Sequence, residues 1–237
     1  MKPLSLEKDG KLYEITGMPA CGKTALLKQA AREIAPEVKI FSGKLMKKCL
    51  GIPDWIVSDK SIFLKFLLFV YACQNFRIFS TTYKITFKII CRMEYSLLMK
   101  AYIYFNIYKK IGRFNFVKKH LSQFHVVVDE GLSHIPFNLT DFHSKKITSI
   151  EKVYIPLKEQ LKNIHLIVLD STHLDIEQRL CRRGHRRFDR EKAHLFVEIN
   201  RNIENGIASF GKKYFKHCSV LDASRTDLLG KFIKTLK

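Results

Sequence analysis

The chain has 237 residues, 46% of them hydrophobic and 27% charged, which is ordinary for a globular protein and argues against disorder. One substantial core fits that length, so we expect a single domain over residues 1–237. Forty-two Lys and Arg against 22 Asp and Glu give a formal charge of +20. Such a field attracts anions, whether nucleotides, nucleic acid, acidic glycan or an anionic membrane surface.

The N-terminus has no apolar run followed by small residues, so we expect no secretory signal. The most apolar stretch, 62–73, is too short to span a membrane and suggests a buried helix. Six cysteines are scattered without a CxxC pair, which argues against a zinc site or disulfide framework. We therefore expect a cytoplasmic protein with reduced thiols.

Predicted strands alternate with predicted helices along the chain. The strands are expected at 11–16, 38–41, 124–128, 165–170 and 218–221. Helical periodicity marks 23–35, 144–161 with a break at Pro156, 175–183, 191–215 and 226–236. This alternation predicts an α/β fold, a three-layer α/β/α sandwich around a parallel sheet of about five strands.

Residues 44–120 lack strand patterns and predict an added helical block, with apolar residues of 80–111 near one helical face. From residue 60 to 119 there are twelve Lys or Arg and one acid, Glu94. The block is expected to form the side of the molecule that binds a small-molecule acceptor. An anionic polymer on the basic face 60–119, or a solvated face over a buried aromatic stripe, remain alternatives.

A glycine-rich loop follows the first predicted strand. Residues 17–24 read GMPACGKT and fit the phosphate-binding pattern GxxxxGK[ST] without a mismatch. Its backbone N–H groups can turn toward phosphate, and the next helix presents its positive end to the same anion. We predict an ATP and Mg²⁺ site in which Lys23 reaches the phosphates and Thr24 is a metal ligand. The expected nucleotide contacts are Gly17, Pro19, Ala20, Cys21, Gly22, Lys23, Thr24 and Ala25.

An acidic pair follows the apolar strand at 124–128. Asp129 stands where a carboxylate would hold Mg²⁺, and we assign it as the second metal ligand. Glu130 follows directly and can take the proton of an attacking hydroxyl or water. Asp170 ends another apolar strand and is the competing acid, for positioning the site or for capping the next helix.

Six arginines lie within 179–190. Guanidinium groups closed over a transferring phosphoryl group stabilise the charge on its oxygens. We therefore predict an arginine-rich lid over 175–190, with Gly184 as a candidate hinge. A basic surface patch for nucleic acid is the alternative.

These motifs resemble those of the P-loop nucleoside and nucleotide kinases, most of all thymidylate kinase and its relatives. The resemblance rests on TGMPACGKT at 16–24, the strand before Asp129, IVLD at 167–170, RLCRRGHRRFDRE at 179–191 and VLDAS at 220–224. It covers roughly 1–41 and 124–237. It implies that Arg179, Arg183 and Arg187 contact phosphate, and that Asp222, Ala223 and Ser224 lie beside the adenine.

The chain departs from that family at three places. Asp129 is followed by Glu130, where thymidylate kinases carry an arginine that grips the acceptor, and Ala20 replaces a common glycine. Residues 41–43 read FSG, without the acid that deoxynucleoside kinases place after the second strand. The resemblance therefore supports the triphosphate half of the site and leaves the acceptor open. We predict a kinase that moves the γ-phosphoryl of ATP to a nucleotide, a nucleoside or a sugar-like hydroxyl compound. The alternative is a nucleic-acid-dependent ATPase or ATP-gated binding protein, and a homodimer is left open.

Overall fold

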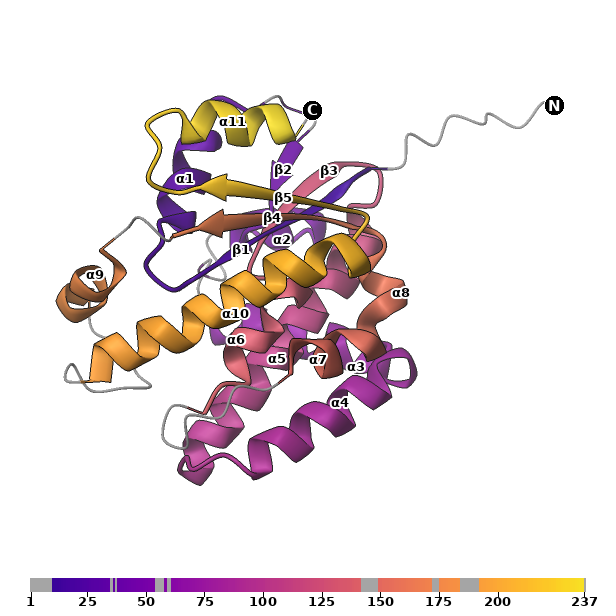
Figure 1. The fold of residues 1–237 in the computed structure, drawn as a ribbon. Coiled ribbons are helices and arrows are strands. Elements are labelled where there is room, and N and C mark those ends of the chain that lie inside the picture. Colours follow the sequence, from indigo (N-terminus) through magenta and orange to yellow (C-terminus); the bar gives the residue numbers. More distant parts are fainter. Residues whose placement is uncertain are drawn as a thin grey trace.

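A wholly parallel, five-stranded sheet organises the computed structural model, which describes residues 10–34, 36, 38–53, 58, 61–141, 149–171, 175–183 and 192–236. The strand order is β2–β3–β1–β4–β5 (Figure 1). In the centre of the sheet, Ile15 pairs with Asp129 on one side and Ile167 on the other. The predicted five-stranded parallel sheet is confirmed. The strands are β1 (Leu12–Gly17), β2 (Val38–Ile40), β3 (His125–Asp129), β4 (Ile164–Asp170) and β5 (His217–Asp222).

Helices follow every strand along the chain. The first part holds α1 (Lys23–Ala30), α2 (Gly43–Cys49), α3 (Ile62–Gln74), α4 (Phe76–Cys91) and α5 (Leu97–His120). Short helices follow β3: η1 (Leu132–His134), α6 (Ile135–Asn138), α7 (Ile150–Tyr154), η2 (Ile155–Leu157) and α8 (Lys158–Leu161). The last part holds α9 (Ile176–Arg183), α10 (Ala193–Tyr214) and α11 (Leu228–Thr235).

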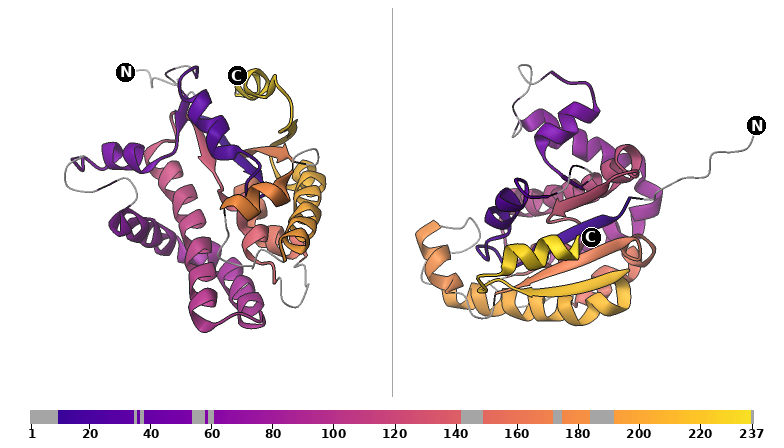
Figure 2. Two further views of the ribbon diagram at one scale, coloured as in Figure 1. Left: turned by 90° about the vertical axis from the view of Figure 1, so that its left-hand side faces the viewer. Right: turned by 90° about the horizontal axis from the view of Figure 1, so that it is seen from above.

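The helices form a layer on each face of the sheet. Helices α1 and α11 cover one face, while α10 and α5 lie on the other (Figures 1 and 2). Successive side chains of a strand point to opposite faces of the sheet. Tyr13 lies on the face covered by α11, where its hydroxyl donates a hydrogen bond to Leu236 O at 3.2 Å. Val126 and Val128 are buried against Phe116 of α5 on the opposite face. Within the described residues, the arrangement is compatible with the expected three layers.

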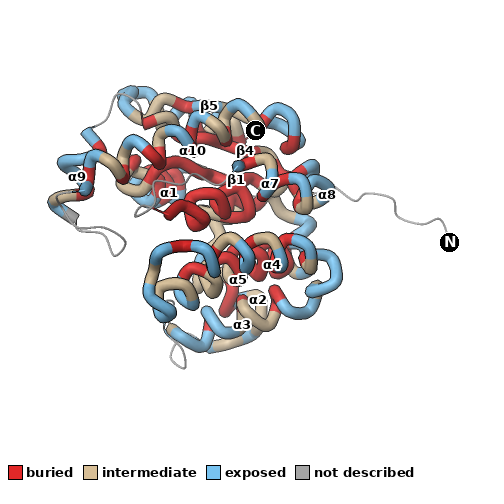
Figure 3. The backbone as a smooth tube through the Cα atoms, turned by 60° about the horizontal axis from the view of Figure 1, so that its bottom comes forward, coloured by how far each residue is buried: buried red, intermediate tan, exposed pale blue. Residues whose placement is uncertain are grey.

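Helix α3 lies unusually close to α5. A Cβ on Gly112 would come within 1.9 Å of Leu68 O, so only glycine permits this approach. Asn115 Nδ2 donates to Tyr71 O at 2.9 Å and fixes the register of the two helices. Figure 3 shows that the inner side of the block is buried while its outer side is exposed.

The expected helical block is present, but one expected helix limit is wrong. Within the block, 80–111 is divided between two helices: α4 ends at Cys91 and α5 begins after Ser96, whose Oγ accepts Met99 N–H at 3.3 Å. Helix α1 ends at Ala30 rather than 35. We expected 62–73 to form a buried helix, but Ile62, Phe63 and Phe66 of α3 are exposed, so this helix is buried only in part. The break expected at Pro156 is present as the 3₁₀ turn η2.

No single helix among the described residues is long and apolar enough to cross a membrane. Helices α3 and α4 meet the length and composition test only as a pair, with a bend of 105° between them.

Candidate functional site

The Gly17–Thr24 loop lies at the carboxyl edge of the sheet, directly after the central strand β1. Gly17, Ala20 and Gly22 have φ angles of +149°, +68° and +102°. A Cβ at Gly17 would lie 2.8 Å from Leu169 O, so this position requires glycine. Gly22 is the N-cap of α1 and has no side chain to satisfy the first helical N–H groups. Those groups can bind an anion.

Lys23 is buried at the base of this loop. Its Nζ donates to Gly17 O at 2.9 Å and Met18 O at 3.0 Å. Burial alone would lower the pKa of this ammonium, but the Cys21 sulfur and the Glu130 and Asp129 carboxylates raise it above its ordinary value. Lys23 is therefore a fixed cation at neutral pH.

Glu204 of α10 holds the Gly17–Thr24 loop through hydrogen bonds. Its Oε1 accepts Met18 N–H at 2.9 Å, and its Oε2 accepts the Ser171 hydroxyl at 2.9 Å. Burial raises the pKa of Glu204, although these hydrogen bonds oppose that effect. The carboxylate thus ties the loop after β1 to the end of β4.

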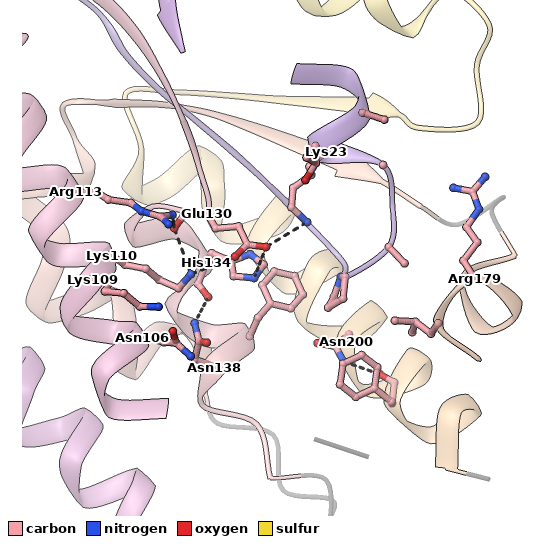
Figure 4. Close-up of a pocket in the computed structure, with 18 of the residues that line it drawn as sticks. Lys23, Asn106, Lys109, Lys110, Arg113, Glu130, His134, Asn138, Arg179 and Asn200 are labelled. Carbon is pink, nitrogen blue, oxygen red and sulfur yellow. Dashed lines mark hydrogen bonds and ion pairs between the residues drawn. The ribbon is translucent and has the colours of Figure 1, made fainter. Parts of the chain in front are cut away.

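A cavity of about 950 Å³ opens beside the loop (Figure 4). This volume is near the upper end of the range of roughly 300–1,000 Å³ for small-molecule sites. The loop and α1 form one wall, α5 forms the opposite wall, and residues of η1, α6, α9 and α10 complete it. The lining consists of Pro19, Ala20, Gly22, Lys23, Thr24, Ala25, Tyr102, Asn106, Lys109, Lys110, Arg113, Glu130, His134, Phe137, Asn138, Arg179, Leu180, Phe196 and Asn200.

Glu130 lies between the two walls. Its Oε1 is 3.8 Å from Lys23 Nζ, and its Oε2 is 3.6 Å from Lys110 Nζ. Burial would raise the pKa of this carboxyl, but His134 (3.5 Å from Oε1), Lys110 and Lys23 hold it well below its usual range. Glu130 is therefore ionised, and it suits orienting a hydroxyl better than removing its proton early.

Backbone strain concentrates at this cavity. Among the described residues, Ala20 and Glu130 are the two that are not glycine and have positive φ, at +68° and +56°. Both line the cavity. Such conformations cost roughly 1–3 kcal/mol and cluster at functional sites, so the surrounding structure holds these two residues in place for a reason other than stability.

Asp129 lies just behind this surface and, unlike Glu130, is not part of the cavity lining. Its Oδ1 is buried without a hydrogen-bond partner. Burial, and then the charge of Glu130, raise the pKa of Asp129. An orphaned buried carboxylate oxygen beside a phosphate-type loop fits a hydrated cation. Thr24 is exposed and lines the cavity, so these two residues could hold Mg²⁺ together with phosphate oxygens.

Within the described ranges, no group of three or more His, Cys, Asp or Glu could hold a metal ion.

The α5 wall carries three cations toward the cavity (Figure 4). Burial lowers the pKa of Lys109 and of Lys110 to about 8 each. Arg113 Nη1 donates to Asp129 O at 2.7 Å, and Lys110 Nζ donates to Glu130 O at 3.3 Å. The wall is thus tied to the end of β3 and remains rich in positive charge.

The structure describes only some of the residues predicted to form the arginine-rich lid and the loop beside the adenine. Arg179 of α9 is exposed and lines the cavity on the side away from α5 (Figure 4). The Arg183 side chain, Gly184 and Arg187 lie outside the described residues. Asp222, Ala223 and Ser224 form a tight turn in which Asp222 Oδ1 accepts Ser224 N–H at 2.9 Å, and they are not in the cavity lining. Cys21, an expected nucleotide contact, is buried, and neither it nor Gly17 is in the cavity lining.

Sequence reasoning missed the residues that complete the site. Lys109, Lys110 and Arg113 were only part of a basic stretch, although their spacing puts them on one side of a helix. His134, whose Nδ1 lies 3.1 Å from Thr16 Oγ1, and Glu204 gave no local signal. No family model, curated protein or solved structure matches this chain.

Proposed function

We propose that this chain is a P-loop phosphotransferase that moves the γ-phosphoryl group of ATP to a small anionic acceptor. One observation carries the proposal: the Gly17–Thr24 loop and the cationic wall of α5 face each other across one cavity. A transferring phosphoryl group needs anion-binding groups on both sides of its path.

The loop wall suits the triphosphate. It combines the open N-terminus of α1, the buried Lys23 ammonium and the exposed Thr24 hydroxyl. Mg²⁺ would be held by Thr24 and Asp129, and it would neutralise charge on the β- and γ-phosphates. Lys23 now contacts loop carbonyls, and a bound phosphate would compete for the same ammonium.

The α5 wall suits an acceptor that itself carries negative charge. Lys109, Lys110 and Arg113 offer two ammonium groups and a guanidinium, which bind phosphate or carboxylate oxygens strongly. Arg113 lines the cavity and donates to the Asp129 and Glu130 carbonyls from α5, so it places a guanidinium next to the position where thymidylate kinases carry their arginine. A phosphomonoester such as a nucleoside monophosphate fits this wall better than a neutral nucleoside or sugar.

The chemistry follows from these positions. An acceptor oxygen forms a bond to the γ-phosphorus while the bond from that phosphorus to the β–γ bridging oxygen breaks, and ADP leaves. Where the acceptor attacks through a hydroxyl, Glu130 accepts its hydrogen bond, orients it and takes its proton as the bond to phosphorus forms; where a phosphate oxygen attacks, there is no proton to move. Arg179, closing from α9, would add positive charge to the transferring group.

A coupled ATP-consumption assay, with products identified by ³¹P NMR, tests the proposal. The panel compares nucleosides, nucleoside monophosphates, sugars, sugar phosphates, and single-stranded DNA and RNA. We expect ADP and a phosphorylated product with a monophosphate acceptor. The Lys28→Ala variant, an exposed lysine on the same helix, should retain activity that Lys23→Ala loses.

The same assay addresses the second candidate, a nucleic-acid-dependent ATPase. Glu130 favours that function, since an ionised carboxylate facing the cavity can also orient water. Stimulation by DNA or RNA with inorganic phosphate as the sole second product would replace the kinase proposal with this one.

A further inference from the structure

We propose that the outer end of the helical block docks on an anionic lipid bilayer. The docking surface is formed by the last two turns of α4, the connection to α5 and the first turn of α5, and is here called the α4–α5 tip. This inference is independent of the reaction proposed above. The tip consists of Lys84, Phe87, Lys88, Arg92, Leu97 and Leu98.

Large apolar side chains project from the tip into solvent. Leu97 and Leu98 are 82% and 84% exposed, and Phe87 is 55% exposed. Isolated exposed apolar residues are ordinary on protein surfaces, but adjacent ones at the end of a helical hairpin indicate an interaction site. Two neighbouring leucines at the first turn of α5 can enter the boundary between headgroups and acyl chains.

The tip is also strongly basic. Lys84 and Lys88 of α4 and its C-cap residue Arg92 are exposed at a spacing of four residues. Like charges at a spacing of four residues repel one another, and an anionic partner offsets that repulsion. Glu94 is the one acid between residues 60 and 119, and the nearby Asp141 carboxylate is buried and accepts Glu94 N–H at 2.9 Å.

The apolar character continues across the block to α3. Aromatic rings are in contact from α4 through α5 to α3, with successive centroid distances of 5.7, 5.0, 5.0 and 6.4 Å. The row ends beside Ile62 and Phe63, which are both exposed. Because the row passes through buried Tyr108, it links the exposed apolar residues of α4 and α3 through the core of the block. The rings of the row are Phe87, Tyr104, Tyr108, Phe69 and Phe66.

Charge and side-chain type together select the bilayer over other occupants. A second copy of the chain would bring lysines against lysines, because the tip has the same sign on both copies. Nucleic acid would satisfy the charge and has the ring of Phe87 for stacking, but it leaves Leu97 and Leu98, the most exposed apolar side chains of the tip, in water. An anionic bilayer satisfies both, since headgroups pair with the lysines while hydrocarbon receives the leucines.

Docking would place the cavity near the membrane surface. Tyr102 lines the cavity and lies one helical turn beyond Leu98 on α5. One turn is about 5.4 Å. The acceptor side of the cavity would therefore lie close to the lipid headgroups.

Vesicle co-sedimentation of the full chain tests this inference. Vesicles of phosphatidylcholine alone are compared with vesicles that also contain phosphatidylserine. The apolar variant is Leu97→Ser with Leu98→Ser, and the charge variant is Lys84→Gln with Lys88→Gln. Matched controls are Val220→Ser, an exposed apolar residue on β5, and Lys158→Gln with Lys162→Gln on α8. Circular dichroism melting checks that all variants stay folded.

We expect binding only to phosphatidylserine vesicles, weakened about five-fold for each lysine removed and at least ten-fold by the leucine pair, with the controls unchanged. No binding, or equal binding to both vesicle types, would overturn the proposal. Unchanged vesicle binding by the variant with Leu97→Ser and Leu98→Ser would also overturn it. If single-stranded RNA then bound this variant as tightly as the parent chain, the tip would be identified as a nucleic-acid surface.

Discussion

The two walls of the cavity achieve a positive potential in different ways. The loop wall uses backbone N–H groups, a helix N-terminus and one buried lysine, all within the eight residues of 17–24. The α5 wall uses three cationic side chains on a helix more than eighty residues away in sequence. Backbone groups bind phosphate with fixed geometry, whereas side chains can titrate and adapt to the ligand. This difference fits the proposed division, in which the loop wall binds the triphosphate of ATP and the α5 wall binds the particular acceptor.

Glu130→Gln removes the carboxylate that both walls share, and we expect the largest effect from it. Without its charge, Lys23 and Lys110 lose a common partner and the acceptor hydroxyl loses its orienting group. The turnover number should fall by roughly 10²- to 10³-fold, as for loss of a principal catalytic group. Steady-state kinetics measure this, with exposed Glu159→Gln as the control. Unchanged turnover would remove Glu130 from the mechanism.

Lys110→Met should affect binding of the acceptor but not of ATP, and so distinguish the roles of the two walls. We expect the KM for the acceptor to rise about ten- to a hundred-fold, because a charged hydrogen bond contributes roughly 1.5–3 kcal/mol. The KM for ATP should change little. Lys118→Met, an exposed lysine on the same helix, is the matched control. An equal rise in both KM values would show that the walls do not divide the substrates.

The α5 wall should also be sensitive to pH where the loop wall is not. Burial lowers the pKa of Lys109 and Lys110 from 10.5 to about 8, so both lose their positive charge as pH rises through 8. We expect kcat/KM for the acceptor to decline above pH 8, by about ten-fold per unit for each proton required. Lys23 has a raised pKa and stays charged.

A double variant with Lys109→Arg and Lys110→Arg tests that assignment. Arginine remains protonated throughout this range, so the decline should move to higher pH. The same decline in parent and variant would assign the titration to another group.

Ala20→Gly gives the smallest effect and probes strain in the loop wall. Ala20 has φ +68°, where a glycine avoids the clash of Cβ with the backbone. We expect the free energy of unfolding to rise by about 1 kcal/mol, measured by urea denaturation. Ala31→Gly is the matched control, because Ala31 has φ −58° and should be destabilised instead. A loss of stability in Ala20→Gly would mean that the loop is not strained.

The sheet and the loop wall could be predicted because their signals are local. The runs HVVVD and HLIVLD predict buried parallel strands, and the glycine spacing predicts the loop that follows β1. The end of α4 was also within reach: Ser96 caps α5 just as Ser61 caps α3, with Oγ accepting the N–H three residues on. Such capping serines mark in the sequence where the helices of the block begin.

The α5 wall could not be predicted, because its orientation is set by tertiary packing. Periodicity places Lys109, Lys110 and Arg113 on one side of a helix but does not say what that side faces. The close contact of Gly112 with Leu68 O fixes the rotation of α5, and nothing local in the sequence encodes that partner. Glu204 and Met18 are likewise joined across 186 residues.

Equilibrium titration with Mg-ATP, by calorimetry, tests the central claim most directly. The parent chain and Lys28→Ala should bind one ATP per chain in a Mg²⁺-dependent manner, and Lys23→Ala should bind at least ten-fold more weakly, since a charge-assisted contact is lost. Absence of ATP binding by the parent chain, or equal affinity in Lys23→Ala, would contradict the assignment of residues 17–24 as a phosphate site.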